Sequence, residues 1–169
     1  MAHVTFVLGG ARSGKSARAL AHAPAPHVFI ATAEALDQEM AERIHLHKEE
    51  RGPSWRLAEA PLDIGPAIAE HAGPKTTLVI DCLTLWLSNL VHHERDIGAE
   101  TDRLLDALET APGRVVLVSN EIGLGLAPME SLSRRFRDAQ GRLNQRIAAA
   151  ADRVEFIAAG IPLVLKDDG

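Results

Sequence analysis

The sequence predicts an α/β fold, with a mainly parallel sheet and helices on both faces. Short apolar, β-branched runs alternate with longer stretches of helix-forming residues along the whole chain. Glycine and proline stand mostly between these segments, where they separate elements instead of interrupting them. Because alternating strands and helices form parallel sheets joined by crossovers, this order favours a single layered domain over residues 1–169.

The expected elements follow one another in regular order. Val, Ile, Leu and Phe dominate the strands predicted at residues 4–8, 27–31, 55–58, 76–81, 114–119, 154–158 and 163–166. Ala, Leu, Glu and Arg dominate the helices predicted at residues 16–22, 34–50, 62–71, 83–92, 96–110 and 131–151. No repeat, low-complexity tract or linker divides them.

The composition is that of a globular protein, with 46% hydrophobic and 24% charged residues. A net charge of −5 argues against general binding to nucleic acid or to membrane surfaces. Cys82 is the single cysteine, which excludes an intramolecular disulfide and a cysteine metal cluster. No signal peptide and no membrane span are expected, because the apolar runs are all short. We therefore expect a soluble, cytoplasmic protein.

The most informative motif is the glycine-rich segment between the first strand and the first helix. It fits the phosphate-loop pattern, in which backbone N–H groups and a helix N-terminus face a polyphosphate. Lys15 is expected to reach the β- and γ-phosphates, and the Ser16 hydroxyl to bind Mg²⁺. A glycine turn without a ligand is the alternative, but the flanking strand and helix disfavour it. The predicted nucleotide-binding residues are Gly9, Gly10, Ala11, Arg12, Ser13, Gly14, Lys15 and Ser16.

Asp81 ends the strand Leu78-Val79-Ile80-Asp81, at the sheet edge where ligands bind in such folds. A carboxylate there is placed to hold Mg²⁺ or nucleotide opposite a phosphate loop. The alternative is a helix cap for the segment that starts at Cys82.

The second predicted helix carries two histidines on opposite sides. On a helical wheel, Leu36, Met40 and Ile44 share one face with His47, whereas His45 points the other way. The two histidines therefore do not form a metal-binding pair. A histidine on an apolar face is commonly a core residue, but imidazole beside a nucleotide is also a competent nucleophile toward phosphorus. The residue pattern leaves both roles open for His47.

Two further segments carry polar residues toward the predicted ligand edge. The stretch 118–128 leaves a strand and contains two glycines, which favours a mobile active-site loop over an ordinary surface loop. The last long helix carries several arginines, which are expected to form a solvated face, with one or two available to phosphate or a neighbouring subunit. These are Arg134, Arg135, Arg137, Arg142 and Arg146.

Several motifs occur together in one order along the chain. They are GGARSGKS, IAT at the end of the second strand, DQEMAERI before His47, Trp55-Arg56 with Glu59, SNEIGLGLAP, and the tail GRLNQRIAAAADRVEFIAAGIPLVLK. In this combination the chain resembles the bifunctional adenosylcobinamide kinase/adenosylcobinamide-phosphate guanylyltransferase family of cobalamin biosynthesis.

The resemblance implies a RecA-like phosphate-loop nucleoside triphosphatase fold, a homotrimer and two reactions. The family phosphorylates adenosylcobinamide with ATP or GTP, and then transfers GMP from GTP to adenosylcobinamide phosphate. It implies a guanylylated His47, catalysis by Lys15, and Mg²⁺ on Ser16 and Asp81. Beyond the glycine loop, it places nucleotide contacts on Ala31, Thr32, Ala33, Lys48, Glu49, Glu50, Arg51, Glu59 and Asp81.

Two other functions fit a phosphate loop. One is a small-molecule kinase without guanylyl transfer, in which His47 is merely structural. The other is a nucleotide-dependent switch or assembly module. The sequence has no Asn-Lys-x-Asp motif for reading guanine and no basic nucleic-acid face, which counts against the switch.

Overall fold

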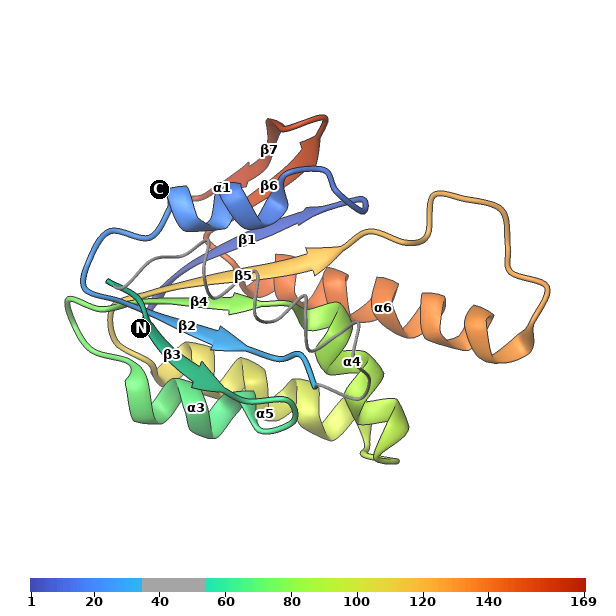
Figure 1. Ribbon diagram of the computed structural model, residues 1–169, viewed down its shortest axis with the longest axis horizontal. Coiled ribbons are helices and arrows are strands. Elements are labelled where there is room, and N and C mark those ends of the chain that lie inside the picture. Colours follow the sequence, from blue (N-terminus) through green and yellow to red (C-terminus); the bar gives the residue numbers. More distant parts are fainter. Residues whose placement is uncertain (35–53) are drawn as a thin grey trace.

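The computed structural model describes residues 1–34 and 54–169, and its strands form one sheet in the order β3-β2-β4-β5-β1-β6-β7 (Figure 1). Neighbouring strands are parallel, except that β7 pairs with β6 in the antiparallel direction. The predicted mainly parallel sheet is therefore confirmed. The strands are β1 His3–Gly9, β2 His27–Ala31, β3 Arg56–Glu59, β4 Thr77–Asp81, β5 Arg114–Asn120, β6 Arg153–Ala158 and β7 Ile161–Asp167.

The described helices cover both faces of this sheet. The short helix α1 packs over β1 and β5 on one face, and the longer helices lie on the other (Figure 1). They are α1 Lys15–Ala21, α3 Ile64–His71, α4 Leu83–His92, α5 Ile97–Thr110 and α6 Ser131–Ala150. Within the described residues, every predicted strand and helix is present, with bounds that agree to within two residues.

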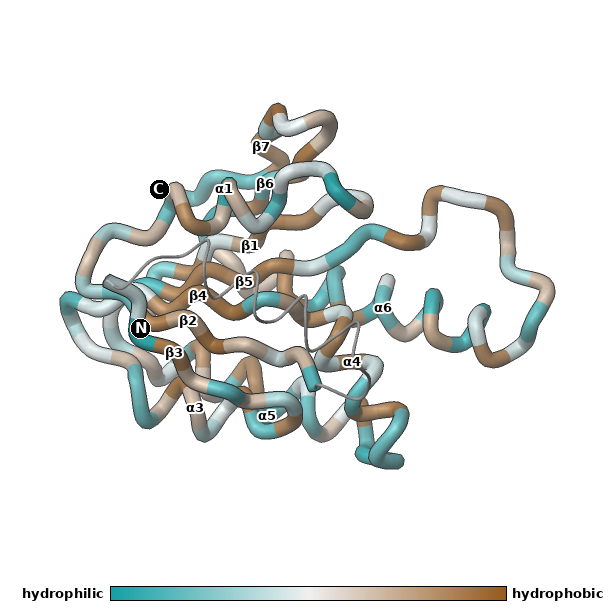
Figure 2. The backbone as a smooth tube through the Cα atoms, in the orientation of Figure 1, coloured by the Kyte–Doolittle hydropathy of each residue, from teal (hydrophilic) through white to brown (hydrophobic). Residues whose placement is uncertain are grey.

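Successive side chains of each strand point to opposite faces of the sheet, so the core is divided between the two faces. Phe6 is fully buried and belongs to a large cluster that includes Trp86 of α4 and Leu143 of α6. The next residue, Val7, belongs to a smaller cluster with Ala19 of α1 on the opposite face. Because both faces are covered, the inner strands are hydrophobic along nearly their full length, as Figure 2 shows.

The predicted second helix lies outside the described residues, together with His45, His47 and the predicted contacts Lys48, Glu49, Glu50 and Arg51. Glu34, where that helix was expected to begin, is described and is not helical.

Among the helices in residues 1–34 and 54–169, none combines the length and the hydrophobicity that crossing a membrane needs.

Candidate nucleotide site at the carboxyl edge of the sheet

The glycine loop joins β1 to α1 through a backbone that only glycine accommodates at two points. Gly14 has φ of 99°, in the left-handed region that side chains disfavour. A Cβ atom on Gly9 would lie 2.5 Å from the carbonyl oxygen of Ile157 and 2.7 Å from Ser13 Oγ. Gly9 and Gly14 are therefore required by the fold, independently of any ligand.

Contacts within the loop and with the β6–β7 turn hold it in shape. Lys15 Nζ donates to the carbonyl oxygen of Gly10 at 2.9 Å, so the ammonium group lies over the loop backbone. The Gly160 amide donates to the Ser13 carbonyl oxygen at 2.7 Å, and Gly160 also lies against Gly14. The loop is thus supported before a phosphate binds, which is the preorganisation that phosphate loops require.

The two predicted metal ligands meet, although 65 positions separate them in the sequence: Ser16 Oγ donates to Asp81 Oδ2 at 2.6 Å. A hydroxyl and a single carboxylate suit Mg²⁺, which takes few protein ligands and completes its shell with water and phosphate oxygens. Among residues 1–34 and 54–169, no group of three or more His, Cys, Asp or Glu residues could hold a metal ion. The residues present therefore fit Mg²⁺ bound together with a nucleotide.

Asp81 is not the helix cap that the alternative interpretation required. Cys82 is the N-cap of α4, and its sulfur accepts a hydrogen bond from the Leu85 amide at 3.5 Å. Burial, helped by the negative charge of Asp81, raises the pKa of the Cys82 thiol to about 12, so the thiol stays neutral. The Asp81 carboxylate remains directed to the phosphate loop.

A buried polar cluster fixes the ends of β2 and β4 beside Asp81. The Thr32 hydroxyl donates to the Cys82 carbonyl oxygen at 2.7 Å and accepts from the Cys82 amide at 2.8 Å. Asn89 of α4 donates from Nδ2 to the Thr32 carbonyl oxygen at 2.7 Å. Thr32 is fully buried, so its hydroxyl serves this backbone junction. The sequence contains no local signal for this role, because the three partners come from separate elements.

Strand register brings other predicted contacts into one row. Ala31 pairs with Glu59 of β3 on one side and with Asp81 of β4 on the other. Thr32 and Ala33 continue the chain beyond β2 at the same edge. These predicted nucleotide contacts therefore lie along the carboxyl edge of β3, β2 and β4, as parallel packing demands, although the Thr32 side chain is buried and engaged with Cys82.

A buried carboxylate that sequence reasoning missed ties α1 to β6. Glu155 is fully buried, and its oxygens accept from Arg18 Nε at 2.7 Å and from Arg18 Nη2 at 2.8 Å. Arg153 Nε donates to the same carboxylate at 2.9 Å, and His22 Nε2 lies 3.1 Å away. These contacts, led by Arg18, outweigh burial and lower the pKa of Glu155 to about 2. The sequence does carry a signal for this contact, because Glu155 is a charged residue inside an otherwise largely hydrophobic strand.

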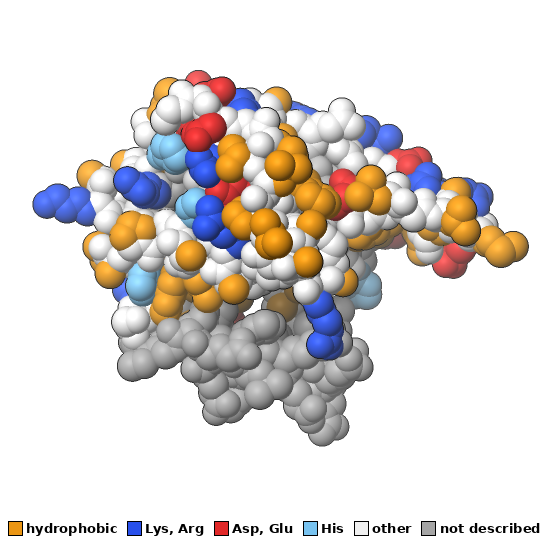
Figure 3. Space-filling model, turned by 90° about the horizontal axis from the view of Figure 1, so that it is seen from above, with side chains coloured by type: hydrophobic (Ala, Val, Ile, Leu, Met, Phe, Trp, Pro, Cys, Tyr) orange, Lys and Arg blue, Asp and Glu red, His pale blue; other side chains and the backbone are white. Residues whose placement is uncertain are grey.

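Beyond β5, residues 121–130 form a loop that projects from the body of the molecule (Figure 1). Hydrophobic side chains are visible along this projection in Figure 3. Leu126 is 99% exposed and Met129 is 98% exposed. Arg134 of α6 donates to the carbonyl oxygens of Pro128 and Met129 and so holds the far end of the loop.

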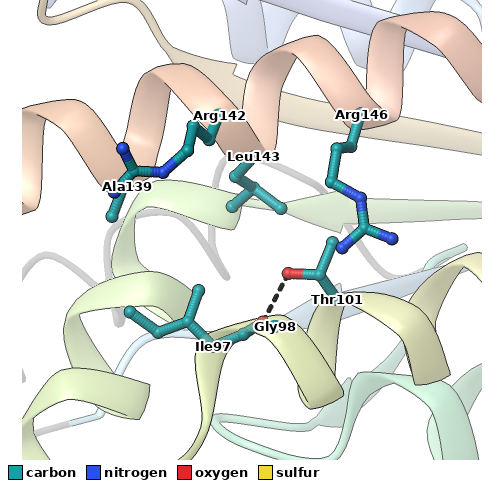
Figure 4. Close-up of a pocket in the computed structure, with 7 residues that line it drawn as sticks. All are labelled: Ile97, Gly98, Thr101, Ala139, Arg142, Leu143 and Arg146. Carbon is teal, nitrogen blue, oxygen red and sulfur yellow. Dashed lines mark hydrogen bonds between the residues drawn. The ribbon is translucent and has the colours of Figure 1, made fainter.

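A separate hollow of about 290 Å³ lies between α5 and α6 (Figure 4). Leu143 lies on the α6 side, near the arginines Arg142 and Arg146, and Ile97 and Thr101 come from α5. Both helices cover the face opposite α1, so this hollow is separate from the glycine loop.

Comparison with known proteins agrees with this arrangement. The cobinamide kinase / cobinamide phosphate guanyltransferase family matches residues 5–165. This chain belongs to that family. The bifunctional adenosylcobalamin biosynthesis protein CobP of Pseudomonas aeruginosa is 44% identical over 96% of this chain and 97% of its own length. The CobU protein of Salmonella typhimurium is 41% identical over 95% of this chain and 98% of its own length.

Solved structures support the RecA-like α/β fold. The flagellar accessory protein FlaH of Methanocaldococcus jannaschii superposes with a TM-score of 0.51 at 10% identity, covering 98% of this chain and 79% of FlaH. The PH0250 protein of Pyrococcus horikoshii superposes with a TM-score of 0.59 at 6% identity, covering 99% of this chain and 87% of PH0250. At such identities the likeness concerns the fold alone.

Proposed function

We propose that this protein phosphorylates adenosylcobinamide with ATP or GTP and then transfers GMP from GTP to adenosylcobinamide phosphate, giving adenosylcobinamide-GDP. Family membership over residues 5–165 is the observation that carries this proposal. The glycine loop, with Ser16 bound to Asp81, supplies the matching site for a nucleoside triphosphate.

In the kinase step, positioning and charge neutralisation provide most of the catalysis. Lys15 exchanges the Gly10 carbonyl oxygen for the β- and γ-phosphates, and the loop amides hold the remaining phosphate oxygens. Ser16 and Asp81 would hold Mg²⁺. Bound there, Mg²⁺ supplies positive charge that neutralises the phosphate oxygens.

In the guanylyl step, His47 attacks the α-phosphorus of GTP and pyrophosphate leaves. The phosphate of adenosylcobinamide phosphate then displaces the imidazole from the resulting phosphoramidate, and adenosylcobinamide-GDP is formed. We assign the remaining nucleotide contacts to the residues that match the family pattern: Ala31, Thr32, Ala33, Lys48, Glu49, Glu50, Arg51, Glu59 and Asp81.

We further propose a cytoplasmic homotrimer. The exposed apolar side chains Leu124, Leu126 and Met129 support self-association, since projecting hydrophobic loops are commonly covered by a partner. The lone Cys82 is free and buried, which is in keeping with a reducing compartment.

The guanylyl proposal is tested by incubating the protein with [α-³²P]GTP and Mg²⁺. Acid-labile, alkali-stable label on the wild-type protein is expected, with none on His47→Asn and normal labelling of the matched control His45→Ala. Labelling of His47→Asn, or its loss in His45→Ala, contradicts the assignment of the nucleophile. An unlabelled wild type favours the small-molecule kinase or the nucleotide-dependent switch.

The kinase and guanylyl reactions should separate in the same variant. Phosphoryl transfer needs no protein nucleophile, so His47→Asn should still convert adenosylcobinamide to its phosphate with ATP. It should accumulate that phosphate when GTP is supplied, as chromatography of the corrinoids would show. Continued formation of adenosylcobinamide-GDP would exclude a covalent route through His47.

A further inference from the structure

Strand β5 lies between the strand that leads into the glycine loop and the strand that carries Asp81. Its last residue, Asn120, pairs with Gly9, and Val118 pairs with Asp81. Glu121 comes next, and its amide donates to the Gly9 carbonyl oxygen at 2.9 Å. Glu121 therefore leaves the sheet beside the first residue of the glycine loop, on the side toward Asp81.

The Glu121 carboxylate is held but remains accessible. Its Oε1 accepts from the Gly123 amide at 2.6 Å, and the side chain is partly exposed. No hydrogen bond to Glu121 Oε2 occurs within residues 1–34 and 54–169. One oxygen thus orients the group, and the other is available to a bound molecule.

The backbone beneath Glu121 is fixed from two helices. The Asn120 amide donates to Thr84 Oγ1 of α4 at 2.9 Å, and its carbonyl oxygen accepts from Asn144 Nδ2 of α6 at 3.1 Å. Asn144 belongs to a buried cluster in which Ser119 Oγ donates to Asn144 Oδ1 at 2.7 Å. Such support is what a catalytic side chain needs in order to hold its position.

The other described carboxylates near this edge are engaged or more distant. Asp81 accepts from Ser16, and Glu155 is buried between guanidinium groups. Glu59 lies at the end of β3, which β2 and β4 separate from β5. Glu34 follows β2, and its Oε1 lies 3.1 Å from His93 Nε2.

We propose that Glu121 is the general base of the kinase step. The acceptor hydroxyl oxygen bonds to the γ-phosphorus while the bond to the β,γ-bridging oxygen breaks, and the bridging electron pair leaves with the nucleoside diphosphate. The hydroxyl proton passes to Glu121 Oε2 and then to solvent. This inference rests on the proposed kinase activity, and it assigns the proton acceptor that the glycine loop and Lys15 do not supply.

The two transfers differ in their need for this base. An alcohol must lose its proton as it attacks phosphorus, whereas the phosphate of adenosylcobinamide phosphate is already ionised near neutral pH. The attack of His47 on GTP involves no acceptor hydroxyl at all. Removing the Glu121 charge should therefore impair the kinase reaction and leave both guanylyl reactions intact.

The test is Glu121→Gln, which keeps the Oε1 acceptor for Gly123 and removes only the basic oxygen. Glu130→Gln is the matched control, because Glu130 is exposed and stands at the N-cap position of α6, at the other end of the same loop, with no side-chain hydrogen bond to the helix backbone. For Glu121→Gln we expect the kinase kcat to fall by about 10²- to 10⁴-fold, the range for general acid–base groups. Covalent labelling by [α-³²P]GTP, GMP transfer to supplied adenosylcobinamide phosphate and the Tm should match those of Glu130→Gln.

Two results would overturn the assignment. Kinase turnover within threefold of wild type would mean that no proton passes to Glu121. Parallel loss of kinase activity and covalent labelling would mean that Glu121 holds the nucleotide instead of acting on the acceptor. Failure of the proposed function is recognised separately, because then the wild-type protein itself would form neither adenosylcobinamide phosphate nor labelled histidine.

Discussion

The glycine loop at residues 9–16 and the loop at residues 121–130 leave the same edge of the sheet, yet they are built in opposite ways. In the first, backbone groups and Lys15 are fixed by contacts with the loop itself and with Gly160. In the second, the ends are fixed near Gly9 and Arg134, whereas Leu126 is almost completely exposed.

The difference follows from what each loop must contact. Backbone N–H groups bind phosphate well only when their directions are set beforehand, and the glycine loop is supported from within by Lys15 and from the β6–β7 turn by Gly160. Exposed leucines stabilise a protein only when another surface covers them. The second loop accordingly is held at its two ends alone and leaves its tip exposed. Substitutions in the first loop should therefore affect catalysis, and at its constrained glycines also folding, whereas those at the tip of the second should affect association.

Among the substitutions that test this comparison, the largest effect is expected from Lys15→Ala, which removes the cation expected to contact the β- and γ-phosphates. We expect the kinase kcat to fall by roughly 10²- to 10³-fold, the scale of losing one preorganised electrostatic contact. The urea unfolding midpoint should stay near that of wild type, because the Lys15 side chain lies at the surface of the loop. Steady-state kinetics would check this, and activity within twofold of wild type would remove the loop from the catalytic site.

The next effect concerns Glu155, which ties α1, the helix after the glycine loop, to β6, and whose pKa is lowered from 4.5 to about 2. Because the folded-state pKa is depressed, the stabilisation is complete above about pH 4.5 and is lost as the pH falls through 2. A shift of this size corresponds to at most about 3 kcal/mol.

Glu155→Gln should lower the free energy of urea unfolding near pH 7, and the difference from wild type should shrink as the pH falls from about 5 toward about 3, through the ordinary carboxyl pKa. Glu109→Gln, at an exposed position on α5, is the control and should show no such trend. A pH-independent difference for Glu155→Gln would mean that packing, not charge, connects α1 to β6.

A smaller effect is expected when one glycine in each loop is replaced by alanine. Gly14→Ala forces a side chain into positive φ and places a Cβ atom 3.2 Å from Gly160 Cα, which should cost roughly 1–2 kcal/mol. Gly125→Ala meets nothing within 4 Å and should change the free energy of unfolding by less than about 0.5 kcal/mol. Equal costs at the two positions, measured by urea unfolding, would show that the loops are equally constrained.

The smallest effect on folding, and a selective one on assembly, is expected for Leu126→Ser. Leu126 is 99% exposed, so the free energy of unfolding of the single chain should change by less than about 0.5 kcal/mol. Sedimentation velocity should show a smaller fraction of trimer. Val91→Ser, at a partly exposed position at the end of α4, is the control and should leave the proposed trimer intact. Unchanged assembly of Leu126→Ser would mean that the projecting loop contacts something other than a second copy.

Much of the fold could be predicted from the sequence because the decisive signals are local. The run before Gly9 is apolar and β-branched, and the glycine and lysine spacing after it constrains both backbone and charge. Leu83–His92 was predicted with the bounds that the structure shows, since its helix formers follow directly after a strand. Asp81 was predicted beside Ser16 because parallel strands carry their carboxyl ends to a common edge.

Other features depended on contacts between distant parts of the chain. Arg18 meets Glu155 across 137 positions, and Gly160 fits against Gly14 because β6 happens to lie beside β1. The sequence by itself determined which segments form strands and helices, and which loop has the spacing of a phosphate loop, because periodicity and glycine spacing act over a few residues. Only the tertiary structure decided that Arg18 pairs with the buried Glu155. It also decided that Glu121 follows the strand between those of Gly9 and Asp81. Both depend on strand order and register, which are set by packing over the whole sheet.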